Sequence, residues 1–498
     1  MMNSRKKESV LCAIAIAVLF LFLFLFFTQM HPLQIFDGDD WTYIARFRDA
    51  LPDVRQWNPT RLLPETLMPL CGSIGAFLVT PMTGDYLSSL SLVCALVVCL
   101  FITAYVVVYY WAIQKLFAME KPIALLCSFL FFVAHFLVFR SKSENNLYLF
   151  FSTSTACYFF YTLPVLLNAV LVMFFERNRS EHKALGHAAK GMLLLACYLA
   201  LYSNIFSSVV LAVYAGVTLL LDGLESLFRR ERRAFVSVIR RDAVHILILA
   251  AWFICLYYEK SGGRADNIGV GLTWSSLKKV VLNLLSVFPL LNRGFVGFSV
   301  VVCVLSLLLL AVSRLKAEED RAFLRAAVLY VLCAALTAIY LVLLCANGTL
   351  TSYIKRADVL IAIFFFVLLG LTACLGYLFK KLSFLEISLP VLILIAAFQC
   401  CTTENTFKNP YVRYSDPQDV RAITKTIYRQ VVDAYNDGQE EITLFLPDMS
   451  VEGNWPLPVF LGSRIADALL VHGQTPSRLQ INVVVDDAEF NRLLSAAL

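Results

Sequence analysis

Three aspartates, Asp37, Asp39 and Asp40, follow the first long apolar run of the sequence within four residues. Carboxylates this close repel one another, and the repulsion raises the pKa of at least one of them. A carboxylate of raised pKa can serve as a general base toward a hydroxyl, and two carboxylates can hold a divalent cation. The alternative is an acidic, solvated turn in which Asp39 or Asp40 caps the start of a helix.

Residues further along the same loop would complement such a base. Trp57 provides a flat aromatic surface for stacking, Arg61 provides a cation suited to phosphate, and Glu65 adds another carboxylate. We therefore interpret the loop at about 28–87 as the catalytic segment and include these three side chains among the substrate-binding candidates.

Three further segments carry candidate binding residues, each with a plainer alternative. Lys355 and Arg356 precede an apolar run at headgroup depth, where they could hold a lipid phosphate or snorkel to the interface. Arg264 belongs to a glycine-containing segment, 259–266, that suits either a mobile lid or an ordinary solvated loop. Trp455 could stack on a sugar ring or lie in a protein core.

These candidates must be positioned by membrane helices, because the composition excludes a single soluble domain. Of the 498 residues, 59% are hydrophobic and 16% are charged, against about 25% charged in an ordinary soluble domain. A membrane-spanning helix needs roughly 20 predominantly apolar residues. The runs that we interpret as eleven spans are 10–27, 88–111, 122–139, 161–176, 190–203, 206–221, 243–258, 295–313, 326–345, 358–378 and 387–401.

Lysine and arginine indicate which loops face the cytoplasm, since short cytoplasmic loops are enriched in both. With the N-terminus inside and eleven spans, the basic clusters at 177–190, 229–241, 314–325 and 380–381 all lie inside. A twelfth span at 62–82 would invert the topology of everything after it and place the basic cluster at 229–241 outside. We therefore predict that 62–82, which contains Pro and Gly repeatedly, is a re-entrant or surface-lying helix. The predicted fold class is an all-α polytopic membrane protein.

The apolar runs end near residue 403, which divides the chain into a transmembrane domain, 1–403, and a small extracytoplasmic α/β domain, 404–498. In the latter, a helix is predicted to start at Asp416-Pro417, with strands at 442–446 and 481–485 around a helix near 457–471. This domain has eight basic and thirteen acidic residues, and the rest of the chain has 34 basic and 23 acidic ones. The net charge of +6 therefore reflects basic inner loops and gives no support to a nucleic-acid partner.

Other residue patterns exclude several further classes of site. Almost all of the 14 cysteines lie in apolar runs, the six histidines lack metal-ligand spacing, and the sequence has no glycine-rich phosphate loop. Ser152, Thr155 and Asn168 lie beside or within apolar runs. We expect them to make helix–helix hydrogen bonds, with contact to substrate as the alternative.

An acidic pair directly after the first span of a polytopic helical protein resembles the GT-C superfamily of membrane glycosyltransferases, which use lipid-linked sugars. The layout is most similar to that of bacterial serotype-converting O-antigen glucosyltransferases. In that superfamily a carboxylate of the first outer loop deprotonates the acceptor hydroxyl, which displaces a polyprenyl phosphate with inversion. The resemblance implies this role for Asp39 or Asp40, with Asp37 as the other aspartate of the Asp37-Gly38-Asp39 pattern.

The resemblance also implies the partners and location of the protein. The donor would be a polyprenyl-phosphate-linked sugar, a hexose by this comparison, and the acceptor a cell-surface glycan or a lipid-linked glycan. The enzyme would lie in the bacterial inner membrane, in contact with the lipid bilayer, with its active site and C-terminal domain extracytoplasmic. Donors linked through one phosphate can react without a metal, while Asp37 and Asp39 permit a divalent cation.

Two other functions remain open at this stage. A flippase or transporter for a lipid-linked saccharide predicts charged residues within spans and inverted repeats, and the sequence has no repeat. A glycan polymerase or ligase would also act on lipid-linked saccharides outside the cell. The late outer loops of this chain, such as 346–357, are short for that class.

Overall fold

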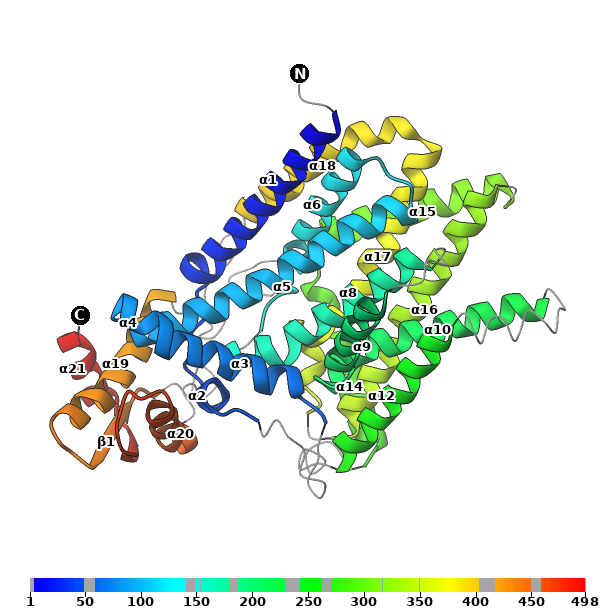
Figure 1. Ribbon diagram of the computed structural model, residues 1–498. Helices are drawn as coiled ribbons and strands as arrows, with labels where there is room; N and C mark the ends of the chain where they lie inside the picture. Colours follow the sequence, from blue (N-terminus) through cyan, green and yellow to red (C-terminus); the bar gives the residue numbers. More distant parts are fainter. Residues whose placement is uncertain are drawn as a thin grey trace.

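The computed structural model of the chain describes residues 4–48, 59–139, 148–152, 154–179, 186–228, 242–261, 271–315, 317–348, 350–402, 417–448 and 458–497. Its described part is almost entirely helical (Figure 1). The long helices that form the bundle are α1 (Ser4–Leu25), α5 (Tyr86–Leu116), α6 (Lys121–Leu137), α8 (Leu163–Asn178), α9 (His187–Leu201), α10 (Ile205–Phe228), α12 (Ala243–Ser261), α15 (Arg293–Ser313), α16 (Glu318–Ala346), α17 (Ala357–Lys381) and α18 (Leu389–Thr402).

Shorter elements connect the bundle helices. They are η1 (Phe26–Met30), α2 (Gly38–Ala45), α3 (Leu62–Ile74), η2 (Gly75–Val79), α4 (Thr80–Thr83), α7 (Thr155–Cys157), η3 (Tyr158–Thr162), α14 (Trp274–Leu285), η4 (Phe288–Leu290), η5 (Tyr353–Lys355) and η6 (Ser383–Ser388). Of these, η1, η2 and η3 are single π-helical turns. Such turns widen a helix locally and often occur at functional sites.

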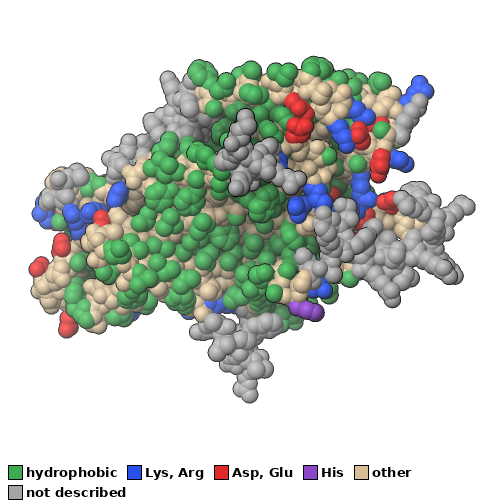
Figure 2. Space-filling model, turned by 45° about the horizontal axis from the view of Figure 1, so that its top comes forward, with side chains coloured by type: hydrophobic (Ala, Val, Ile, Leu, Met, Phe, Trp, Pro, Cys, Tyr) green, Lys and Arg blue, Asp and Glu red, His purple; other side chains and the backbone are tan. Residues whose placement is uncertain are grey.

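The predicted membrane class agrees with the helices of the structure. Nine helices of the described residues are long and apolar enough to cross a bilayer, and eight of them coincide with predicted spans. The other three predicted spans correspond to shorter apolar helices, at Lys121–Leu137, His187–Leu201 and Ser383–Gln399. Figure 2 shows a broad hydrophobic face between regions of charged side chains. Apolar surface of this extent, together with helices of spanning length, indicates a lipid bilayer environment.

The ninth long helix, Leu62–Thr83, comprises α3, η2 and α4 and has a different orientation. At its start, the Arg61 N–H donates to the carbonyl of Tyr202, in the turn between α9 and α10. At its end, the hydroxyls of Thr83 and Ser89 are hydrogen-bonded over 2.7 Å, next to the start of α5. Since both contacts lie at the same end of the bundle, the helix runs across that end (Figure 1). This course is compatible with the predicted re-entrant or surface-lying helix, although its length and composition also suit a span.

The bundle therefore has two distinct ends. We call the end that carries α2, α3, the turn at 202–204 and the residues 350–356 the loop end. We call the opposite end, where α5, α8 and α17 finish and α16 starts, the basic end. Its described lysines and arginines include Lys115, Arg177, Arg179, Arg325 and Lys380.

The described residues of the C-terminal segment form a unit of three helices and a two-stranded sheet. It contains α19 (Pro417–Asn436), β1 (Glu441–Leu446), α20 (Pro458–Val471), β2 (Gln480–Val485) and α21 (Asp487–Ala497). The two strands pair in parallel, with Leu444 opposite Val483, and α20 is part of the crossover between them. The predicted strands and helices are therefore confirmed within the described residues.

This unit packs on the loop end of the bundle. Helix α20 lies against α2, and the Tyr86 hydroxyl at the start of α5 is hydrogen-bonded to Nδ1 of His472 over 2.6 Å. Tyr86 also stacks on Tyr428 of α19, with ring centroids 5.4 Å apart. The acidic turn at Asp37–Asp40 consequently lies between the bundle and the C-terminal unit.

Candidate functional site

The acidic turn is the start of helix α2, and its three aspartates have three different environments. Asp37 is the N-cap, and its side chain accepts from the Gly38 N–H over 2.7 Å. Asp40, three residues later, accepts from the Asp37 N–H and completes a capping box. The helix-start interpretation is thus correct, but the N-cap is Asp37, whereas the sequence suggested Asp39 or Asp40. The box satisfies backbone donors that the first turn would otherwise leave unpaired.

Asp40 is fully buried and uses both carboxylate oxygens. Its Oδ1 accepts from the Ala156 N–H over 2.5 Å, and its Oδ2 accepts from the N–H groups of Asp37 and Phe36 over 3.1 and 3.3 Å. Burial, and secondarily the charge of Asp37, raise the pKa of Asp40 well above its usual range, while the N–H donors oppose the shift. A side chain enclosed in this way is positioned to hold the turn at Asp37–Asp40, and the hydroxyl of a substrate cannot reach it in this conformation.

Asp39 is the accessible member of the group. Its side chain is 60% exposed, and its Oδ1 accepts from Nη1 of Arg464, in α20, over 2.8 Å. Asp37 is half-buried, and its burial, followed by the nearby charge of Asp39, raises its pKa. Asp37 and Asp39 are therefore the two aspartates that a substrate hydroxyl can approach, and the raised pKa of Asp37 suits a proton acceptor.

The segment Ser154–Thr162, which forms α7 and η3, connects the acidic turn to the rest of the loop end. Besides Ala156, it supplies Thr155, whose hydroxyl donates to the carbonyl of Gln34 over 2.7 Å. Thr162 exchanges a hydrogen bond of 2.7 Å with Ser152, and Asn168 of α8 donates to the carbonyl of Ala200 of α9 over 2.9 Å. The predicted helix–helix hydrogen bond is thus found for Asn168, while Thr155 bonds the segment before α2 and Ser152 bonds the nearby η3.

Arg356 contacts the same segment from the other side. Its Nη2 donates to Sγ of Cys157 over 3.2 Å, directly after the residue that bonds Asp40. Nε and Nη2 also bind both oxygens of Asp358, over 2.9 and 2.6 Å, and the guanidinium lies 4.5 Å from the ring centroid of Tyr161. The hydrogen bonds that Arg356 makes to described residues use Nε and Nη2. The neighbouring Lys355 is exposed.

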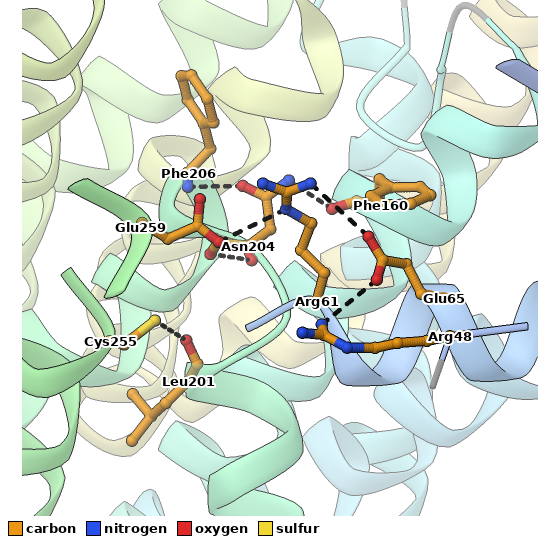
Figure 3. A network of polar contacts seen from close by, with 10 residues as sticks. Arg48, Arg61, Glu65, Phe160, Leu201, Asn204, Phe206, Cys255 and Glu259 are labelled. Atoms are coloured by element: carbon orange, nitrogen blue, oxygen red, sulfur yellow. Dashed lines mark hydrogen bonds and ion pairs between the residues drawn. The ribbon is translucent and has the colours of Figure 1, made fainter. Parts of the chain in front are cut away.

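Arg61 and Glu65 belong to a separate charged network at the loop end (Figure 3). Arg61 lies between two carboxylates, 3.7 Å from Glu65 and 3.6 Å from Glu259. Glu65 is also 3.3 Å from Arg48. Two arginines and two glutamates thus largely balance one another, and the network joins α3 to the last turn of α12. Beside it, Asn204 donates to the carbonyl of Phe160 over 2.6 Å, which ties this region to η3.

The structure corrects one segment and leaves several predicted residues untested. Glu259 was assigned to a loop at 259–266, but α12 extends to Ser261, because its last turn is held against Arg61. Trp57, Arg264 and Trp455 lie outside the described residues. Among the described residues, no three His, Cys, Asp or Glu side chains converge as metal ligands, and a cation at Asp37 and Asp39 stays a prediction.

A cavity of about 180 Å³ opens at the loop end beside the acidic turn. Its wall includes Thr28, Gln29 and Gln34 after α1, Ser88 of α5, and Arg421 of α19. None of the three aspartates lines it. The cavity does approach the turn through Gln34, whose carbonyl binds Thr155.

Sequence reasoning missed two partners of the predicted residues. Arg464, the partner of Asp39, is 425 positions away along the chain, and Glu259 is likewise remote from Arg61. No local pattern marks either pair, because ion pairs between distant segments depend on how the helices pack. Compared with known protein families, characterised proteins and solved structures, the chain matches none.

Proposed function

We propose that this protein is an inverting glycosyltransferase that moves a sugar from a polyprenyl-phosphate carrier to a glycan outside the cell. One observation carries the proposal. The acidic turn and Arg356 bind successive residues, Ala156 and Cys157, at one end of a membrane bundle. The turn that carries the proposed proton acceptor therefore contacts the same short segment as the proposed phosphate-binding arginine.

In the proposed reaction, Asp37 or Asp39 accepts the proton of the acceptor hydroxyl. The hydroxyl oxygen then bonds to the anomeric carbon of the sugar, from the face opposite the phosphate. The bond between the anomeric carbon and the phosphate oxygen breaks, and its electron pair leaves with the polyprenyl phosphate, so that the configuration inverts. Arg356 would stabilise the charge on that phosphate through its Nη1 hydrogens.

Asp40 has a different role in this proposal. Its two oxygens already accept three backbone N–H groups, so it orients the turn and does not exchange protons with substrate. Asp39 pairs with Arg464, and its charge raises the pKa of Asp37. This arrangement favours Asp37 as the proton acceptor and Asp39 as the residue whose charge raises the pKa of Asp37.

The test is a transfer assay in membrane vesicles that contain the full chain. Labelled polyprenyl-phosphate hexoses (glucose, galactose and mannose) are supplied with a crude cell-envelope glycan, and product is measured for wild type, D37N, D39N and R356K. A general base contributes about 10²- to 10⁴-fold, so D37N should lose at least 100-fold. R356K should also be impaired, because lysine lacks the bidentate geometry of arginine.

A matched control comes from Asp467, which is 59% exposed and pairs with Arg478 over 2.5 Å. D467N removes a similar exposed ion pair away from the turn and should transfer like wild type. If wild type transfers no sugar from any of these donors, or if D37N and D39N both retain full activity, the proposal is wrong. Movement of the donor without transfer would instead identify a flippase, and growth of a chain a polymerase or ligase.

A further inference from the structure

The basic end of the bundle contains a second cavity, unrelated to the proposed transfer site. Its volume is about 410 Å³, and its wall is formed where α5, α8 and α17 end and α16 begins. Five cationic side chains line it, against two carboxylates, Glu176 and Glu319. The cationic residues are Lys115, Arg177, Arg179, Arg325 and Lys380. Charged side chains of both signs gather beyond one edge of the hydrophobic face in Figure 2.

The carboxylates around the cavity neutralise only some of these cations. Asp222, which is buried behind the wall, is hydrogen-bonded to both Arg179 and Arg325. Lys380 lies 2.9 Å from Glu319. Glu176 accepts a hydrogen bond from the Tyr214 hydroxyl over 2.8 Å, so one of its carboxylate oxygens already has a partner. The lining carries three more positive than negative groups, and Asp222 together with Glu225, which lies 2.9 Å from Arg325, reduces this excess to one.

Two arginines of the wall keep hydrogen-bond donors available. Arg177 donates to the Trp111 carbonyl and to Oδ1 of Asn178, and it forms no ion pair with any carboxylate of the described chain. Nη1 of Arg179 is buried and, within the same residues, has no hydrogen-bond acceptor. A buried guanidinium N–H without an acceptor is costly, and an anion in the cavity would supply one.

We propose that this cavity binds the phosphate group of an anionic phospholipid. A phosphate suits guanidinium donors because its oxygens accept several N–H bonds at once. The rest of the wall is apolar and aromatic, with Leu116, Phe117, Phe323, Ala326 and Tyr330. Such a lining matches the glycerol and upper acyl carbons of a lipid and has no counterpart in a small soluble anion. Basic pockets between membrane helices bind acidic headgroups in this way.

The test measures thermal unfolding of the purified full chain in detergent during titration with dioleoyl phosphatidylglycerol. Dioleoyl phosphatidylcholine and inorganic pyrophosphate serve as parallel probes. We expect phosphatidylglycerol to raise the Tm in a saturable way and phosphatidylcholine to have at least tenfold weaker effect. In R177Q the apparent Kd for phosphatidylglycerol should rise about tenfold, because a charge-assisted donor is lost while the Asp222 pairs remain.

R321Q is the matched control, because Arg321 is exposed on the first turns of the same α16 and does not line the cavity. If R177Q proves unstable before lipid is added, K380Q provides the second variant and should also weaken binding. Equal effects of the two phospholipids, or equal binding by R177Q, K380Q and wild type, would overturn the proposal. A rise in Tm with pyrophosphate but not with phosphatidylglycerol would assign the cavity to a soluble anion and overturn the proposal of a lipid.

Discussion

The contrast between Asp40 and Asp39 yields the sharpest prediction. The substitution Asp40→Asn nearly conserves the shape of the side chain but replaces one acceptor oxygen with an NH2 donor. In the native structure N–H groups face both oxygens, Ala156 on one side and Asp37 with Phe36 on the other. Whichever way the introduced amide turns, a donor therefore meets a donor. We expect D40N to destabilise the protein even though it conserves volume.

The size of the effect follows from the number of donors left unpaired. Each buried donor without an acceptor costs about 1–3 kcal/mol. D40N leaves either the Ala156 donor or the other two unpaired, so we expect a loss of about 1–3 kcal/mol or slightly more. D40A leaves all three unpaired and should cost more than D40N. D39N, by contrast, removes an exposed ion pair with Arg464 and should cost less than about 1 kcal/mol.

The assay is thermal unfolding of purified D40N, D40A and D39N under identical detergent conditions, together with transfer activity in vesicles. The expected order of Tm is D39N close to wild type, then D40N, then D40A. The activity of D40N should fall in proportion to the loss of folded protein. An unchanged Tm for D40N together with abolished transfer would refute this reasoning, because Asp40 would then act in the chemistry and not in holding the turn.

Two further predictions concern the packing around the same turn. A Cβ at Gly72 would lie 2.0 Å from the Ile44 carbonyl oxygen, so G72A must separate α3 from α2 and should lower the free energy of unfolding by more than about 2 kcal/mol. A Cβ at Gly191 would have nothing within 4 Å, so the control G191A should unfold at the wild-type temperature or slightly above it. Burial lowers the pKa of His472 from 6.5 to about 4, so its contribution is complete above pH 6.5 and is lost as the pH falls toward 4. Between pH 6.5 and 4.5, the protection factors of the α20 amides, which correct the exchange rate for its intrinsic pH dependence, should therefore fall in wild type and depend less on pH in H472N. Wild-type protection factors that do not change with pH would contradict this assignment.

Much of the helical layout could be predicted because bilayer thickness imposes a length on apolar runs. Eight of the nine long helices coincide with predicted spans, and the strands predicted at 442–446 and 481–485 pair with each other. Pro and Gly within 62–82 disfavour a regular span, and the prediction of a re-entrant or surface-lying helix there stays a prediction, because Leu62–Thr83 is also long and apolar enough to cross a bilayer. The exact N-cap could not be predicted, because Asp37, Asp39 and Asp40 all fit a helix start by residue type alone.

The sequence by itself determined the membrane class of this protein, most of its helices and the concentration of carboxylates after the first span. These properties depend on hydrophobicity and on local preference, which neighbouring residues decide. Only the tertiary structure decided that Asp40 is enclosed by backbone donors, that Asp39 meets Arg464 and that Arg61 lies between two glutamates. The physical reason is that burial and ion pairing also depend on contacts between segments far apart in the sequence, such as Asp40 with Ala156 and Asp39 with Arg464, and these meet only when the helices pack.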